Sequence, residues 1–227
     1  MSIKRRASRM SPEKRTADIL AAARHVFSKR GYDDLVMAEI ADQAGVVEGS
    51  IYRYFRNKRE LMFRMAEDWF EEMISNDEQT LQAISGIANR LRFIIHRHLI
   101  SIQEQPDLSR LVFQHLRPDP EYRSSKLFEL NRAYTGRVIQ IVREGVEEGE
   151  LRSNISAVLV RDLIFGSIEH RTWAFLRKEG DFNADELGDE LARLIWKGIS
   201  LENDTGEISP LLERLESTLC RLEKEFL

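Results

Sequence analysis

Cysteine is nearly absent from this sequence of 227 residues, in which Cys220 is the only one. A single cysteine excludes an internal disulfide and a cysteine-rich zinc site. Long apolar runs are also missing. None approaches the roughly 20 residues that a membrane-spanning helix needs, and no apolar signal-peptide core follows the basic N-terminus. We therefore expect a soluble, intracellular protein of the cytoplasm that makes no use of a membrane.

Glycine and proline are sparse, at 12 and 5 residues, and they fall between segments with helical periodicity. Alternation typical of strands is weak throughout, so the pattern predicts an all-α fold. Ser11 as N-cap, Pro12 in the first turn and Gly31 after the end delimit the first helix. The pairs Asn57/Glu60 and Asn183/Glu186 read as capping boxes. The expected helices span residues 12–30, 37–43, 48–54, 58–75, 78–104, 107–116, 121–148, 156–178, 184–200 and 210–226.

The formal net charge of −4 is distributed unevenly. Residues 1–60 contain 13 Lys+Arg against 8 Asp+Glu, whereas the remaining 167 residues contain 21 against 30. A basic N-terminal quarter on an acidic body is expected when one end of a protein meets a polyanion. A solubilising tail on an ordinary globular protein explains the same balance, so charge alone leaves both interpretations open.

The segment 37–55 predicts a helix-turn-helix, since two short helical patterns flank a tight turn at Gly45. Ile40, Ala41 and Ala44 suit the face on which the two helices cross, and Val46 fills the inner side of the turn. Ile51 and Phe55 lie four residues apart and anchor the second helix on the core. The residues left over on the second helix face outward: Val47, Glu48, Gly49, Ser50, Tyr52, Arg53 and Tyr54.

An outward face of this kind suits a recognition helix, whose N-terminal residues read base edges in the major groove. The hydroxyls of Tyr52 and Tyr54 can reach phosphates, and Lys58 can hold another phosphate at the start of the following helix. Arg5 and Arg6 provide a basic arm. Helix-loop-helix segments also occur in α-helical proteins that never touch DNA, and this alternative stays open on the segment alone.

Residues 12–62 resemble the N-terminal domain of the TetR family of transcriptional regulators. The matching motifs are Ile40 to Val46 (Ile-Ala-x-x-Ala-Gly-Val), Gly49 to Phe55 (Gly-x-x-Tyr-x-Tyr-Phe) and Lys58 to Leu61 (Lys-x-x-Leu). The resemblance implies a homodimeric repressor that binds a palindromic operator in double-stranded DNA. It further implies a helix-turn-helix domain over residues 1–58 and a helical ligand-sensing and dimerisation domain over residues 59–227.

The resemblance adds Val36 and Met37 to the expected DNA-contacting positions. It also exposes two departures, because the family usually has Ser or Thr where Val36 stands and often Ser where Val47 stands. Valine can neither cap a helix nor bind phosphate, and a missing cap costs about 1 kcal/mol. Glu48 brings negative charge toward the DNA, where it can accept a hydrogen bond from a cytosine amino group.

The acidic body has two apolar stretches, at residues 151–176 and 187–199. By the family resemblance they form a dimer interface, although packing within one subunit explains them almost as well. Residues 143–151 and 164–168 resemble family members that respond to fatty acyl-coenzyme A, which implies a small hydrophobic inducer. The residues expected to line its pocket, each of which ordinary core packing also explains, are Phe93, His96, Ile100, Phe113, Leu116, Tyr134 and Phe165.

We expect no metal, no cofactor and no enzymatic activity. His96 and His98 lie two residues apart, so on one helix they point to different sides, and no nucleophile elbow or phosphate-binding glycine loop is present. Two rival functions remain: a constitutive or architectural DNA-binding protein without a sensor, and a helical protein-interaction module. The salt dependence of binding distinguishes DNA from a protein partner.

Overall fold

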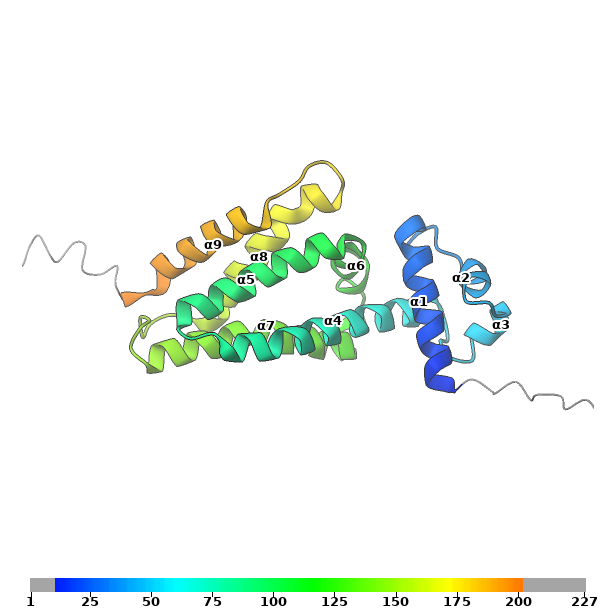
Figure 1. The fold of residues 1–227 in the computed structure, drawn as a ribbon, viewed down its shortest axis with the longest axis horizontal. Coiled ribbons are helices and arrows are strands. Elements are labelled where there is room, and N and C mark those ends of the chain that lie inside the picture. Colours follow the sequence, from blue (N-terminus) through cyan, green and yellow to red (C-terminus); the bar gives the residue numbers. More distant parts are fainter. Residues whose placement is uncertain (1–10, 202–227) are drawn as a thin grey trace, which may run out of the picture. The chain divides into compact units, whose positions relative to one another are not determined.

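The computed structural model describes residues 11–201, and within that range the regular secondary structure is helical apart from one isolated β-bridge (Figure 1). The all-α prediction is therefore confirmed. Among the described helices, none combines the length and apolarity needed to cross a membrane. The elements are α1 (Pro12–Arg30), α2 (Met37–Gln43), α3 (Glu48–Ile51), α4 (Lys58–Ala83), α5 (Ile87–Glu104), α6 (Pro106–Leu111), the π-helix η1 (Val112–Leu116), the 3-10 helix η2 (Tyr122–Ser124), α7 (Lys126–Glu147), α8 (Ala157–Leu176) and α9 (Ala184–Ile199).

The chain divides into two compact units. Among the described residues, the first unit comprises those up to Asp77 together with Gln103–Tyr134, and the second comprises Glu78–Ile102 together with those from Thr135 onward. The predicted boundary of the DNA-binding domain near residue 58 coincides with the first residue of α4. Because the first unit continues along α4 beyond that residue, the predicted boundary stays a prediction.

Helix ends marked by capping residues in the sequence are confirmed. Ser11 Oγ accepts a hydrogen bond from Lys14 N at 3.3 Å, and Gly31 ends α1 with φ 77°. Asn57 Oδ1 accepts from Glu60 N at 2.9 Å. The Glu60 carboxylate closes this box on the backbone N–H of Arg56, at 2.7 Å, one residue before the expected partner. These helices begin where polar side chains satisfy their free N–H groups.

Several predicted boundaries are wrong. We expected a break near residues 75–78, but α4 continues to Ala83 and the chain turns at Gly86, with φ 85°. Polar residues such as Asn76 are tolerated on an exposed helix face, and the left-handed conformation of Gly86 allows the chain to turn between α4 and α5. The second helix of the helix-turn-helix ends at Ile51, three residues early, and a short 3-10 turn precedes α7. The predicted helix 210–226 lies outside the described residues.

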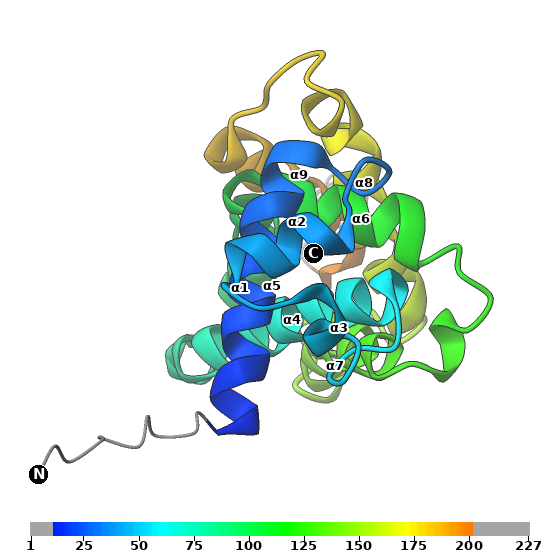
Figure 2. The same ribbon diagram turned by 90° about the vertical axis from the view of Figure 1, so that its right-hand side faces the viewer.

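The core of the helix-turn-helix forms on one side of α1. Figures 1 and 2 show α2 and α3 lying on the same side of this helix. The predicted apolar stripe of α1 is buried in full: Ile19, Leu20, Ala23, Val26 and Phe27. Ile40 and Ala41 of α2 and Ile51 of α3 are also buried. The outward residues of α3 are therefore held on a packed three-helix support.

In the second unit, the segment that follows α7 makes backbone contacts with the C-terminal end of α9. Leu151 and Ser200 form the isolated antiparallel bridge, and Leu201 N donates to Glu150 O at 3.1 Å. Leu151 packs beside Gly145, where a Cβ atom would lie 2.8 Å from the leucine side chain. Gly145 thus leaves the space that the bridge segment occupies.

Candidate nucleic-acid interface

The turn between α2 and α3 fixes the orientation of both helices. Ala44 N donates to Ile40 O at 2.9 Å and Val46 N donates to Ala41 O at 3.0 Å, so backbone hydrogen bonds close the end of α2. Gly45 adopts φ 64°, a conformation that glycine reaches without steric cost. Hydrogen bonds and the glycine conformation together hold the turn as the sequence predicts.

The surface of α3 presents the residues expected to read DNA. Val47, Glu48, Gly49, Tyr52 and Arg53 are exposed, while Ser50 and Tyr54 are half-buried. A Cβ atom built on Gly49 meets nothing within 4 Å, so nothing within the described chain requires a glycine there. The described chain therefore leaves room for a larger side chain at this position, and the DNA contact expected for Gly49 stays a prediction.

Glu48 and Tyr52 form a polar pair on this surface. The Tyr52 hydroxyl donates to Glu48 Oε1 at 3.3 Å, one helical turn away. Desolvation and the Glu48 carboxylate raise the pKa of the Tyr52 phenol, so the hydroxyl keeps its proton at neutral pH. The sequence predicted a phosphate contact for Tyr52, and the pair gives this hydroxyl an intramolecular acceptor as well.

Lys58 was expected to meet a phosphate, and the structure gives its ammonium group two partners inside the chain. Nζ donates to Asp33 O at 3.3 Å and lies 4.6 Å from the centre of the Tyr32 ring. The same ring stacks on His115 of η1, with centroids 4.2 Å apart and an interplanar angle of 23°. Lys58 therefore helps to hold the α1–α2 connection, a role that sequence reasoning missed.

The remaining predicted DNA-contacting positions differ in accessibility. Val36, the N-cap of α2, is 56% exposed and its side chain makes no cap hydrogen bond. Met37 is only 6% exposed. Its side chain belongs to the core, so the contact with DNA that was expected at this position stays a prediction that involves the backbone. Arg5 and Arg6 lie outside the described residues.

Next to the helix-turn-helix, Arg59 in the first turn of α4 binds two carboxylates from the η1–α7 connection. Arg59 Nε and Nη2 contact Asp119 Oδ2 and Oδ1, each at 2.6 Å, and Nη1 contacts Glu121 Oε2 at 2.8 Å. The guanidinium beside Asp119 holds the pKa of that carboxyl below its usual range. Nothing in the local sequence pairs Arg59 with residues 60 positions away, so this contact could not be foreseen.

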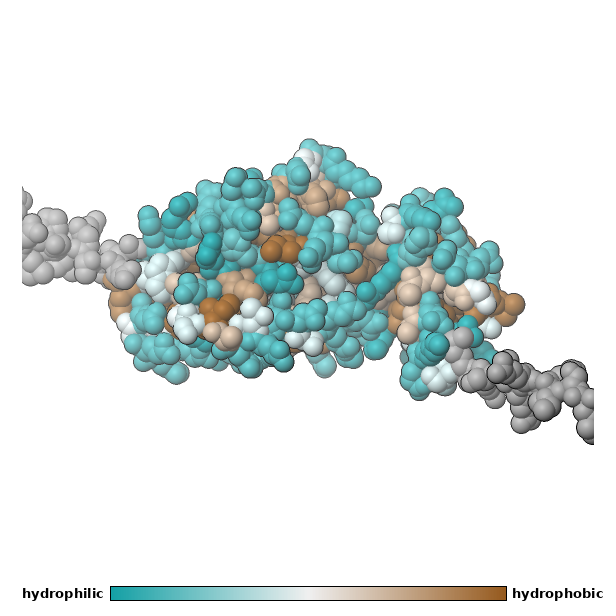
Figure 3. Space-filling model, viewed as in Figure 1, coloured by the Kyte–Doolittle hydropathy of each residue, from teal (hydrophilic) through white to brown (hydrophobic). Residues whose placement is uncertain are grey.

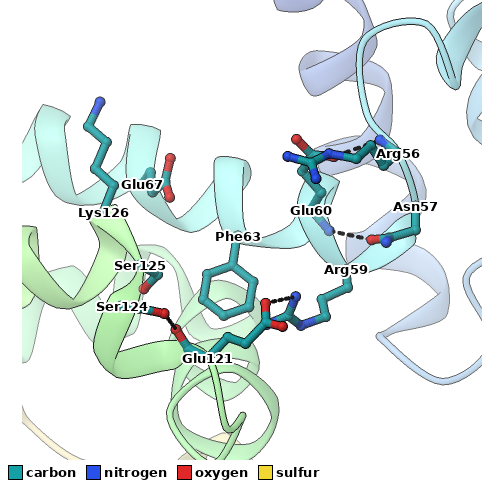
Figure 4. A pocket seen from close by; sticks show the side chains of 10 residues that line it. All are labelled: Arg56, Asn57, Arg59, Glu60, Phe63, Glu67, Glu121, Ser124, Ser125 and Lys126. Atoms are coloured by element: carbon teal, nitrogen blue, oxygen red, sulfur yellow. Dashed lines mark hydrogen bonds and ion pairs between the residues drawn. The ribbon is translucent and has the colours of Figure 1, made fainter.

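A polar pocket of about 250 Å³ opens beside this ion pair. Figure 4 shows Arg59 and Glu121 meeting on one side of the Phe63 ring, with Ser124, Ser125 and Lys126 on the other side of that ring. The guanidinium carbon lies 5.0 Å from the centre of the Phe63 ring. Both charge signs line the pocket, and its guanidinium and carboxylate groups bind one another. The ion pairs thus connect the start of α4 to the segment between η1 and α7.

The residues predicted to line a ligand pocket fall in both units. In the first unit, Tyr134 is buried and packs edge-on against Phe70 at 5.9 Å, Leu116 is buried, and Phe113 is half-buried in η1. In the second unit, Phe165 of α8 packs edge-on against His98, with centroids 4.9 Å apart. Phe93 and Ile100 are half-buried on α5.

His96 makes contacts that the pocket prediction did not include. Its Nε2 lies 2.8 Å from Asp189 Oδ1 and its Nδ1 lies 3.5 Å from Asp185 Oδ1. The ring is seated against Gly188, where a Cβ atom would approach Nε2 to 2.7 Å. Arg92 binds the same Asp189 oxygen at 2.6 Å, and Arg92 followed by His96 lowers the pKa of that carboxyl. His96 thus connects α5 to α9. Among the described residues, no group of three or more His, Cys, Asp or Glu is placed to hold a metal ion.

Comparison with known proteins assigns both parts of the chain. Residues 19–65 match the family model for bacterial regulatory proteins of the tetR family, and residues 66–198 match the model for the C-terminal region of YsiA-like proteins. The fatty acid metabolism regulator protein of Bacillus subtilis is 25% identical over 181 residues, which cover 80% of this chain and 93% of that protein. The transcriptional repressor KstR2 of Mycobacterium tuberculosis is 24% identical, covering 83% and 94%.

Solved structures give the same assignment. The transcriptional regulator FadR from Bacillus subtilis, determined in complex with stearoyl-CoA, superimposes with a TM-score of 0.72 at 26% identity over 81% of this chain and 98% of that one. FadR from Bacillus halodurans superimposes with a TM-score of 0.69 at 20% identity, which supports the fold. The helix-turn-helix, the helical body and both family models agree, and the chain belongs to the TetR family of ligand-responsive transcriptional regulators.

Proposed function

We propose that this protein is a dimeric repressor whose binding to a palindromic operator is released by a long-chain fatty acyl-coenzyme A. The observation that carries the proposal is the likeness to FadR from Bacillus subtilis, which extends over 81% of this chain. The structure of that protein was determined in complex with stearoyl-CoA. Because the likeness includes the helical body as well as the helix-turn-helix, it supports a shared class of ligand. Since its proposed target is operator DNA, the protein is proposed to act in the cytoplasm.

The DNA-binding part of the proposal rests on α3. Its exposed face presents side chains of the kinds that contact bases and phosphates, with Val47, Glu48, Gly49 and Arg53 accessible. A dimer presents two such helices about 34–36 Å apart, one turn of B-DNA. A basic arm that includes Arg5 and Arg6 adds phosphate contacts in this proposal.

Dimerisation is proposed through α8 and α9. The buried face of α8 repeats every four residues, at Val160, Ile164, Ile168, Thr172 and Leu176. Three apolar residues on the same helix remain exposed: Val158, Leu159 and Leu163, the last at 48%. Leu194 of α9 is 61% exposed. Large apolar side chains exposed together on adjacent helices mark an interaction surface, and a second copy of the chain is the partner that the family predicts.

The inducer site is proposed to involve the ring of Phe165 together with Phe93 and Ile100, which lie in the second unit. Two contacts in the first unit suit a response to such a ligand. His115 of η1 stacks on Tyr32, and Arg59 binds Asp119 and Glu121. Residues 112–121 therefore contact the helix-turn-helix segment near both of its ends. A ligand that prefers another conformation of this segment would shift the population of dimers away from the DNA-binding form.

The test is a titration of fluorescently labelled operator duplex with the purified protein. The duplex is obtained by selection from a random pool. We expect stearoyl-CoA at micromolar concentration to weaken operator binding at least tenfold, while coenzyme A alone and stearate alone leave it unchanged. Operator binding that is indifferent to stearoyl-CoA would contradict the inducer and leave a constitutive DNA-binding protein. Absence of any selected duplex would contradict operator recognition itself.

A matched pair of variants in α8 tests the inducer site. Phe165 and Phe175 are both half-buried and each makes an edge-on ring contact, with His98 at 4.9 Å and with Phe182 at 5.2 Å. We expect Phe165→Ala to weaken stearoyl-CoA binding, measured by calorimetry, while Phe175→Ala retains it. Equal losses in the two variants would mean that the change acts through stability, and unchanged binding in Phe165→Ala would remove this residue from the proposed site.

A further inference from the structure

Two valines occupy the N-cap positions of the helix-turn-helix, and neither caps its helix. Val36 precedes α2 and Val47 precedes α3; both have extended backbones and neither side chain accepts a hydrogen bond from the helix. Both are exposed, Val36 at 56% and Val47 at 75%. Methyl groups left in water to this extent add little to folding, because hydrophobic stabilisation follows the apolar area removed from water.

The two valines differ in the part of DNA that they can reach. In a helix-turn-helix the second helix enters the major groove and contacts base edges with its N-terminal residues, whereas the first helix crosses the backbone. Val47 is therefore placed at base edges and Val36 at the sugar-phosphate backbone. Figure 3 shows apolar surface exposed over α3.

The chemistry of valine limits what Val47 can recognise. Its side chain has neither a donor nor an acceptor, so it cannot read the polar groups of the bases. The apolar group that distinguishes one base pair in the major groove is the C5-methyl of thymine. The next residue, Glu48, has a carboxylate that accepts a hydrogen bond from the Tyr52 hydroxyl. This carboxylate, and not Val47, is the group that can accept a hydrogen bond from a base.

We propose that Val47 packs on a thymine methyl in each operator half-site and thereby selects T·A at that position. The inference rests on the proposed function, because it assumes that α3 enters the major groove of an operator. It deepens that function by naming a base-selecting residue and the group that it reads.

The experiment is a double-mutant cycle that deletes the C5-methyl group of thymine from the DNA and the two γ-methyl groups of Val47 from the protein. In the selected operator, each thymine is replaced in turn by deoxyuridine, which lacks only the C5-methyl, with the matching position in the other half-site changed as well. We expect one position at which deoxyuridine weakens the wild-type protein about fourfold per half-site, the effect of burying one methyl group. At that position Val47→Ala, which keeps only the Cβ methyl, should reduce the difference between thymine and deoxyuridine to about twofold or less per half-site.

Val36→Ala is the matched control, since it removes the same two γ-methyl groups from the other uncapped and exposed N-cap. It should keep the full fourfold difference between thymine and deoxyuridine, and so should Val47→Ile, which retains a branched apolar side chain. Helical content by circular dichroism should be the same in all variants, because neither valine contributes a cap hydrogen bond.

A difference between thymine and deoxyuridine that is the same in wild type and in Val47→Ala at every position overturns the inference and leaves operator binding intact. Loss of the difference in Val36→Ala as well as in Val47→Ala also overturns it, because the methyl would then be sensed indirectly. A random pool from which the wild-type protein selects no duplex overturns both the inference and the proposed function on which it rests.

Discussion

Gly145 shows how a single missing side chain shapes the second unit. A Cβ at this position would approach the buried Leu151 side chain to 2.8 Å, and Ile87 lies next to it at 3.1 Å. Gly136 in the same helix has open space around the corresponding position. Both glycines lie in α7 but differ in their surroundings. Replacing each by alanine therefore distinguishes the effect of helix propensity on stability from the effect of core packing.

We expect Gly136→Ala to raise the free energy of unfolding by about 0.5–1 kcal/mol, since alanine is the better helix former. Gly145→Ala should lower it by about 1–3 kcal/mol, the usual range for overpacking a core. Urea unfolding followed by circular dichroism measures both variants. A gain in Gly145→Ala equal to that in Gly136→Ala would mean that Leu151 moves aside at no cost.

At Gly49 the fold tolerates a larger side chain, whereas the proposed DNA contact requires a small one. The space around it is open, so a larger side chain is tolerated by the described chain. We expect Gly49→Leu to leave helical content and stability within about 0.5 kcal/mol of the wild type, as for other exposed positions. Operator affinity should fall more than about tenfold, because the side chain would occupy the space in which the helix approaches the groove floor.

Retained affinity in Gly49→Leu, measured by fluorescence anisotropy, would indicate that α3 does not enter the groove. The control for a general effect of added apolar surface is Ala38→Leu, at an exposed position of α2. This variant should bind operator within about threefold of the wild type, corresponding to at most about 0.7 kcal/mol.

At the scale of the elements, Arg59 joins α4 to the η1–α7 connection. Planar bidentate pairing with Asp119 at 2.6 Å is the geometry in which an arginine–carboxylate pair contributes most. Because the groups are partly exposed, we expect Arg59→Gln to cost about 1 kcal/mol. Arg56→Gln is the control, since the Arg56 side chain is 89% exposed and pairs only at 3.5 Å with Glu60.

The loss in Arg59→Gln should depend on pH. The pKa of Asp119 is lowered in the folded protein, so the pair contributes fully above the ordinary carboxyl pKa near 4 and fades as the pH falls through the folded value. The difference in urea midpoint between wild type and Arg59→Gln should therefore be constant from pH 7 to about pH 5 and shrink below pH 4. A difference that persists unchanged at pH 3 would contradict the role given to the charged Asp119.

The helices differ from the long-range contacts in how well the sequence predicts them. The bounds of α1 and α2 and the buried faces of α1 to α3 follow from local rules, because caps and helical periodicity act within a few residues. Lys58, Arg59 and His96 acquired roles that depend on partners 25 to 93 residues away. Residue type and spacing carry no record of such partners, so these contacts appear only once the chain is folded. The break at Gly86 was missed because the polar residues before it suit an exposed helix.

For the whole molecule, the proposed binding to a palindromic operator requires a dimer. Leu163→Arg places a charge in the exposed apolar face of α8, where its burial in an interface without a partner would be costly. We expect this variant to sediment as a monomer at micromolar concentration and to lose operator binding. Gln79→Arg, at an exposed position of α4, should remain dimeric. A dimer that survives Leu163→Arg with unchanged dissociation would place the interface elsewhere.

Operator and ligand are proposed to bind different conformations of one dimer, so each should weaken the binding of the other to the same extent. The measurement is the affinity for stearoyl-CoA by calorimetry, for the free protein and for the protein saturated with operator duplex. Thermodynamic linkage requires operator to weaken stearoyl-CoA binding by the same factor by which stearoyl-CoA weakens operator binding. Equal factors of about tenfold or more are the predicted result. Identical stearoyl-CoA affinities with and without operator would contradict the account.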